Sequence, residues 1–134
     1  MYTLLDRTTL DLLGGTAPSF GLGALRDLTE CVAVLGTTGH VTQFSKGSLT
    51  AFDIAQDARL SPKVFWWDIW PEDTRAPVRE AVMRGLNGHI TQYWSPFVHA
   101  DGSISQWNMR LSPLQDSASQ VASVIVVSQR LTTH

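Results

Sequence analysis

One amphipathic segment separates two strand-rich parts of the chain, and this order constrains the fold more than any other feature. Val78, Val82 and Leu86 recur every four residues, which predicts a helix with one apolar face. Pro71 precedes two acidic residues that suit the first turn of a helix, and Gly88 is a typical stop signal. The sequence therefore predicts one clear helix over residues 71–88, with strands before and after it.

Two strand-like segments precede this helix, and three follow it. A short turn joins the first pair, and Asp101-Gly102 is typical of a hairpin turn between the next two. Runs of strands interrupted by helices predict an α+β fold in which a five-stranded antiparallel sheet carries helices on one face. We expect the strands at residues 31–35, 40–45, 89–98, 104–114 and 120–130, and shorter helices at residues 3–13, 22–30, 46–58 and 61–70.

The length and charge of the chain exclude several classes of protein. A chain of 134 residues suits one domain, and a net charge of −2 disfavours nucleic-acid binding through a basic face. No apolar run reaches the roughly 18 residues of a membrane span, so we expect no membrane contact by this chain. The single Cys31 excludes an internal disulfide and a cysteine-based zinc site, which favours a reducing cytoplasm.

Four segments resemble, in order, the strand turns and the helical connection of a PAS domain, a sensory and signalling fold of bacteria. They are VAVLGTTGHVTQFS, FWWDIWPEDTRAPVREAVMRGLNGH, HADGSISQW and LSPLQD. The resemblance covers roughly residues 22–132, although only Thr132 is retained from the usual Asp-Ile-Thr ending. We expect residues 1–18 to form an N-terminal flanking helix and linker, and residues 19–134 to form the PAS domain.

The resemblance implies a function in signal transduction. A PAS domain is a sensor whose sheet and helices enclose a pocket, and flanking helices pass the signal to an effector. The chain would then be an input module that binds a small ligand, mediates dimerisation, or does both. Its expected effector is a bacterial histidine kinase of a two-component system. The chain has no glycine-rich nucleotide motif and no catalytic motif of its own, so we do not expect it to be an enzyme.

The candidate ligand pocket is made of apolar and aromatic side chains. Trp66 and Trp70 would share a helical face, and strand alternation puts Tyr93 and Phe97 on one face of the sheet. Packing of the same side chains into an ordinary core is the competing interpretation, because indoles bury large areas. The candidates are Phe52, Trp66, Trp70, Val78, Val82, Tyr93, Phe97, Trp107 and Met109.

The opposite face of the sheet is the candidate dimer interface. The expected N-terminal helix is too short to bury its own apolar stripe. The stripe must therefore dock on the sheet or on a second subunit. Strand alternation places Trp94 on this outer face. We expect a homodimer formed through Leu5, Leu12, Leu13 and Trp94, with capping of the sheet within one chain as the alternative.

The sequence predicts no cofactor. A covalent flavin adduct needs a cysteine on the helical flank, whereas Cys31 lies in the first strand, and residues 72–87 contain no histidine to bind haem. Non-covalent flavin is left open, and the histidines are too scattered for a metal site. Two alternatives are kept. One is a cone-shaped α+β enzyme similar to ketosteroid isomerase, with Asp68 or Asp73 beside His89, and the other is a PAS scaffold with a filled pocket.

Overall fold

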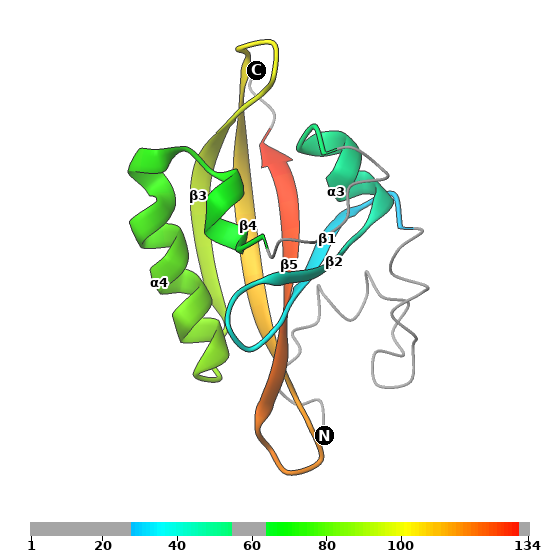
Figure 1. Cartoon of the computed structure of the whole chain (residues 1–134), viewed down its shortest axis with the longest axis vertical. Coiled ribbons are helices and arrows are strands. Elements are labelled where there is room, and N and C mark those ends of the chain that lie inside the picture. The colour runs from blue at the N-terminus through cyan, green and yellow to red at the C-terminus, as the bar shows by residue number, and fades with distance from the viewer. Residues whose placement is uncertain (1–27, 55–63, 132–134) are drawn as a thin grey trace.

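A five-stranded antiparallel sheet forms the centre of the protein (Figure 1). The structure is a computed structural model that describes residues 28–54 and 64–131. The strand order is β2-β1-β5-β4-β3, so the first strand, β1, pairs with the last strand, β5, inside the sheet. The strands are β1 (Cys31–Leu35), β2 (Val41–Phe44), β3 (Thr91–Val98), β4 (Ile104–Gln115) and β5 (Val121–Leu131). The predicted α+β fold is confirmed.

The helical elements of the described residues lie between β2 and β3 in the sequence. In Figure 1, α4 runs along β3 at one edge of the sheet, whereas α3 lies near β1 toward the other edge. The helices are α3 (Lys46–Ala51), the 3-10 helices η2 (Trp66–Ile69) and η3 (Glu72–Thr74), and α4 (Arg75–Leu86). Residues 28–30 of the helix expected at 22–30 are not helical. The helix expected at 3–13, and residues 22–27, 55–58 and 61–63, lie outside the described residues.

The clearest predicted helix begins later than its acidic first turn. Pro77 has no backbone N–H, so an α-helix that began at residue 72 would lack the bond from residue 77 to the carbonyl of Asp73. The chain instead forms a 3-10 turn, in which the Thr74 N–H donates to the Pro71 carbonyl at 2.9 Å. The α-helix starts at Arg75, where Pro77 falls in the first turn and its missing donor costs nothing.

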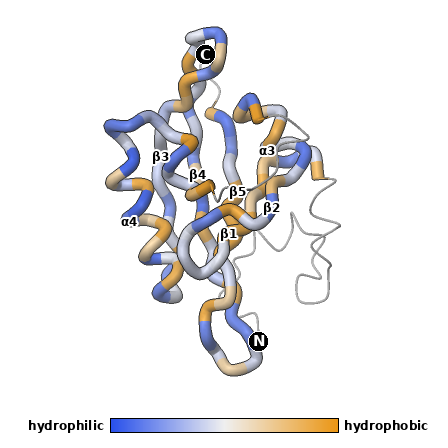
Figure 2. Tube along the Cα trace, in the orientation of Figure 1, coloured by the Kyte–Doolittle hydropathy of each residue, from blue (hydrophilic) through white to orange (hydrophobic). Residues whose placement is uncertain are grey.

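One face of α4 packs on the sheet. Val78 and Val82 are buried, as the four-residue spacing predicts, and Figure 2 shows hydrophobic and hydrophilic segments alternating along this helix. Gly85 is also buried and faces β5, where a Cβ atom at its position would lie 3.4 Å from the side chain of Val124. The helix therefore covers the inner face of the sheet and closes the core on that side.

The free edge of β2 is covered by the segment that leads into η2. The Val41 N–H donates to the Val64 carbonyl at 2.7 Å, and the Trp66 N–H donates to the Gly39 carbonyl at 3.1 Å. An isolated bridge between His40 and Phe65 lies between these two bonds. This pairing holds Trp66 at the sheet edge, with its side chain turned into the core.

Among the helices of the described ranges, none is both long and apolar enough to cross a membrane.

Candidate functional site

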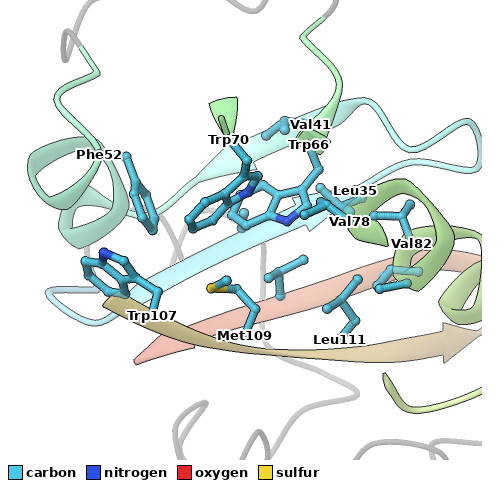
Figure 3. Packing of buried hydrophobic residues seen from close by; sticks show 14 of the residues in the cluster. Leu35, Val41, Phe52, Trp66, Trp70, Val78, Val82, Trp107, Met109 and Leu111 are labelled. Carbon is cyan, nitrogen blue, oxygen red and sulfur yellow. The ribbon is translucent and has the colours of Figure 1, made fainter. Parts of the chain in front are cut away.

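The nine predicted pocket residues lie together between the helices and the inner face of the sheet. Figure 3 shows Trp107, Met109 and Leu111 rising from one strand toward Phe52 and the two tryptophans of the helical side. Eight of the nine are buried, and Tyr93 is partly buried against the same cluster. The structure therefore brings all of these candidates to one place, and their role in holding a ligand stays a prediction.

The aromatic rings of this cluster are in mutual contact. The centroid of the Phe52 ring lies 4.8 Å from that of Trp107, 5.0 Å from that of Phe97 and 5.3 Å from that of Trp70. Trp70 also packs edge-on against Trp66, at 5.7 Å between centroids. Distances of about 4.5–7 Å are those of directly packed aromatic pairs. The rings thus fill the space between the helical layer and the sheet.

The three tryptophans near η2 have different environments. Trp66 and Trp70 are both buried, at 0% and 1% exposure, although the α-helical face predicted to join them does not form. Trp67 is only partly buried, and its ring stacks on Phe65 at 4.9 Å with the Arg79 guanidinium 5.4 Å from its centroid. The element is a 3-10 helix rather than the α-helix that the sequence predicts, and Trp70 is the first residue beyond it.

Two indole nitrogens in the cluster differ in their hydrogen bonding. Trp66 Nε1 donates to the hydroxyl of Tyr93 at 2.7 Å. Burial raises the pKa of the Tyr93 phenol far above its usual range, so the group stays neutral in the folded protein. Trp70 Nε1 is buried and has no hydrogen-bond acceptor within the described part of the chain. An unpaired buried donor is uncommon and marks a place where an acceptor atom would be stabilised.

A chain of hydrogen bonds links the end of α3 to the aromatic cluster, and no sequence pattern indicates it. Asp53 Oδ2 lies 3.1 Å from His99 Nδ1, and His99 Nε2 lies 2.7 Å from Ser105 Oγ. The same Ser105 oxygen accepts a 2.7 Å bond from Trp107 Nε1, and Asp53 Oδ2 also accepts from the Ala100 N–H at 3.0 Å. Asp53 and His99 are 46 residues apart, so only the fold brings them together.

The outer face of the sheet is divided into an exposed and a buried part. Trp94 is 63% exposed and Ile104 is 61% exposed on strands β3 and β4. Val32 and Ile125, on β1 and β5, are fully buried on the same face. Trp94 therefore lies where strand alternation predicted. The other dimer candidates, Leu5, Leu12 and Leu13, lie outside the described residues.

The comparisons with known proteins agree with this architecture. The family model described as PAS fold matches residues 25–134, which is most of the chain. The chain belongs to the PAS family. The predicted resemblance is thus confirmed, and the ketosteroid-isomerase-like alternative is set aside. No match was found among curated proteins.

Solved structures of PAS and light-oxygen-voltage domains share the fold at low sequence identity. A PAS domain from Colwellia psychrerythraea has a TM-score of 0.68 and 14% identity, covering 84% of this chain and 95% of that one. A PAS domain from a two-component sensor histidine kinase has a TM-score of 0.60 and 14% identity, covering 81% and 91%. The light state of the blue-light photoreceptor Aureochrome1 LOV has a TM-score of 0.63 and 17% identity, covering 83% and 88%.

In the described residues, side chains fill the space between the helices and the sheet. One structurally similar light-oxygen-voltage domain was studied with a flavin analogue. Phe52, Trp66 and Trp70 occupy this space with less than 4% exposure each. Cys31 lies in β1, and burial raises the pKa of its thiol, which disfavours the reactive thiolate. The described ranges hold no group of three or more potential metal ligands.

Proposed function

We propose that this chain is a sensory input module that acts through contacts with other proteins and forms a homodimer through the outer face of its sheet. The observation that carries this proposal is the exposed apolar surface made by Trp94, Val98 and Ile104, at 63%, 51% and 61% exposure. Large apolar groups gathered on one face of a sheet are typical of protein interfaces. The expected effector is a bacterial histidine kinase, and a similar fold occurs in such a kinase.

The packed core supports a scaffold rather than a receptor for a large ligand. The rings of Phe52, Trp70 and Trp107 are in direct contact, so an internal ligand the size of a flavin would have to displace them. Close-packed aromatic rings contribute strongly to a core, since truncating one to alanine costs about 3–5 kcal/mol. Signals in such a domain would act through its surfaces and through the orientation of its strands.

The oligomeric state tests the proposal. Native mass spectrometry of the full chain should show a dimer, and Trp94→Glu should shift it to a monomer because a carboxylate replaces an apolar contact at the interface. Ile90→Glu is the matched control, since Ile90 is 42% exposed in the connection between α4 and β3 and should leave the dimer intact. A wild-type monomer, or a dimer unaffected by Trp94→Glu, would contradict the proposed interface.

Binding of a small ligand is a second candidate function, favoured by one atom. Trp70 Nε1 has no acceptor within the described residues, although its side chain is 1% exposed. A small molecule with one acceptor atom would supply the missing bond, worth about 1–3 kcal/mol. The same mass spectra would show it as an added mass on protein purified from its host, and Trp70→Phe should lose that mass. A spectrum without an added mass would contradict this candidate.

A further inference from the structure

We propose that His99 makes this domain responsive to acid, because protonation of its ring breaks the hydrogen-bond chain that runs from Asp53 to Trp107. The chain joins three elements: the end of α3, the β3–β4 hairpin and the inner face of β4. The proton would then be an input of the proposed sensory module. That biological use rests on the proposed function, whereas the response itself is a property of the isolated chain and is tested on it.

The chemistry of the partners fixes where the protons lie when His99 is neutral. The carboxylate of Asp53 only accepts hydrogen bonds, so His99 Nδ1 carries the proton and donates to it. His99 Nε2 then accepts from the Ser105 hydroxyl, and the free lone pairs of Ser105 Oγ accept from Trp107 Nε1. In this arrangement every donor of the chain has an acceptor.

Protonation removes this match. Nε2 becomes a donor, so Ser105 Oγ would receive two N–H groups, from His99 and from Trp107, and its own proton would lose its acceptor. Ser105 is 4% exposed, so water does not readily replace that acceptor. Proton uptake at His99 therefore weakens the bond that holds the Trp107 indole.

The charges around His99 act at the surface and oppose one another. Asp53, whose side chain is 40% exposed, and Asp101 on the hairpin attract an imidazolium. Arg130 on β5 lines the same cleft of about 310 Å³ and repels it. Exposed pairs of this kind are weakened by water and salt. The buried bond to Ser105 thus determines the structural consequence of protonation.

Both ends of the hydrogen-bond chain return to the aromatic cluster. Asp53 directly follows Phe52, whose ring lies 4.8 Å from that of Trp107. Asp53 itself has φ of +56°, a left-handed conformation that a non-glycine residue adopts at a cost and that its bonds to His99 and Ala100 hold in place. Trp107 also pairs with Arg130 in the sheet, near the end of β5. A change at His99 can therefore be transmitted through Trp107 to β5.

A catalytic role for the same residues does not fit. The contacts from Asp53 to His99 and from His99 to Ser105 resemble those of the acid, base and nucleophile in a hydrolase triad. However, the Ser105 oxygen is buried and already accepts from Trp107, so a substrate carbonyl could not reach it. The arrangement is that of a structural link that can respond to a proton.

The Trp107 indole N–H reports directly on the link. In ¹H–¹⁵N spectra of the labelled chain, recorded from about pH 8 to about pH 5, where imidazoles titrate, this resonance should move upfield along a sigmoid. Trp107→Phe assigns it by loss of one of the five tryptophan indole signals. His99→Gln should abolish the movement, whereas His89→Gln, at an exposed position before β3, should leave it unchanged.

Ser105→Ala provides the second variant. In it the Trp107 indole signal should no longer follow the pH, because the hydroxyl that joins His99 to Trp107 is missing. A wild-type indole signal that does not move with pH would overturn the proposal, as would the same movement in His99→Gln or in Ser105→Ala. None of these results depends on the oligomeric state, so failure here is distinct from failure of the proposed dimer.

Discussion

Trp66 Nε1 donates a 2.7 Å hydrogen bond to the hydroxyl of Tyr93, a residue 27 positions further along the chain. Trp66 lies on η2, whereas Tyr93 lies on the edge strand β3, opposite Met109. The bond therefore ties the helical segment to the sheet across the aromatic cluster. It also satisfies an indole N–H that is otherwise fully buried.

Replacing Tyr93 by phenylalanine should destabilise the protein while leaving its shape almost unchanged. The ring would still pack against Trp70, but the Trp66 N–H would lose its acceptor. An unsatisfied buried donor costs about 1–3 kcal/mol. Urea unfolding of Tyr93→Phe, Trp66→Phe and the double variant measures this loss. The double variant should cost less than the sum of the single ones, and simple additivity would mean that the bond contributes nothing.

The same residue should make stability fall at alkaline pH. Burial raises the pKa of the Tyr93 phenol well above its usual range, so the native state keeps a proton that the unfolded state releases above about pH 10. Its stabilising contribution is present below the unfolded pKa and is lost as the pH rises, by up to about 1.4 kcal/mol per pH unit. Urea unfolding at about pH 9 and pH 11 should show this decline in the wild type, and Tyr93→Phe should reduce it. An equal decline in both proteins would contradict the burial of a neutral phenol.

Two glycines with the same backbone conformation should differ in their tolerance of alanine. Gly39 and Gly102 both have φ of +87°. A Cβ atom at Gly102 would meet nothing within 4 Å, so alanine there should cost only the left-handed strain of about 1–2 kcal/mol. A Cβ atom at Gly39 would lie 2.6 Å from the Trp67 ring, which is held by Phe65 and Arg79. Thermal unfolding should therefore show a further loss of about 1–3 kcal/mol for Gly39→Ala. Equal losses for the two variants would show that Trp67 moves aside freely.

Ser45 should be among the polar residues least tolerant of substitution. Its buried Oγ accepts from the N–H groups of Val32 and Ser48 and donates to the Glu30 carbonyl at 2.6 Å, so it caps α3 and fixes the start of β1. Ser45→Ala would leave these backbone groups unpaired, and urea unfolding should show a loss of about 1–3 kcal/mol. Thr50→Ala is the control, because its hydroxyl only bonds within the exposed side of α3 and should change stability by less than about 0.5 kcal/mol. Similar losses in both variants would contradict this role of Ser45.

Much of the fold was predictable because its signals are local. The four-residue repeat of Val78 and Val82 and the alternation of Trp107 and Met109 depend only on helix and strand geometry, and all four side chains are buried as expected. The α-helix α4 starts later than the sequence predicts, because an earlier start would need a hydrogen bond from Pro77, which has no backbone N–H. The nine candidate pocket residues were found together, since large apolar side chains on inward faces must meet in one core.

The local sequence specifies which residues face inward and in what order strands and helices follow, because periodicity and turn residues act over a few neighbours. The folded chain alone reveals that Asp53, His99 and Ser105 form one hydrogen-bond chain and that Tyr93 pairs with Trp66. These contacts join segments far apart in the chain, and polar side chains carry no periodic signal that says which distant partner will satisfy them. Burial imposed the pairing, since a donor removed from water is stable only where the fold supplies an acceptor.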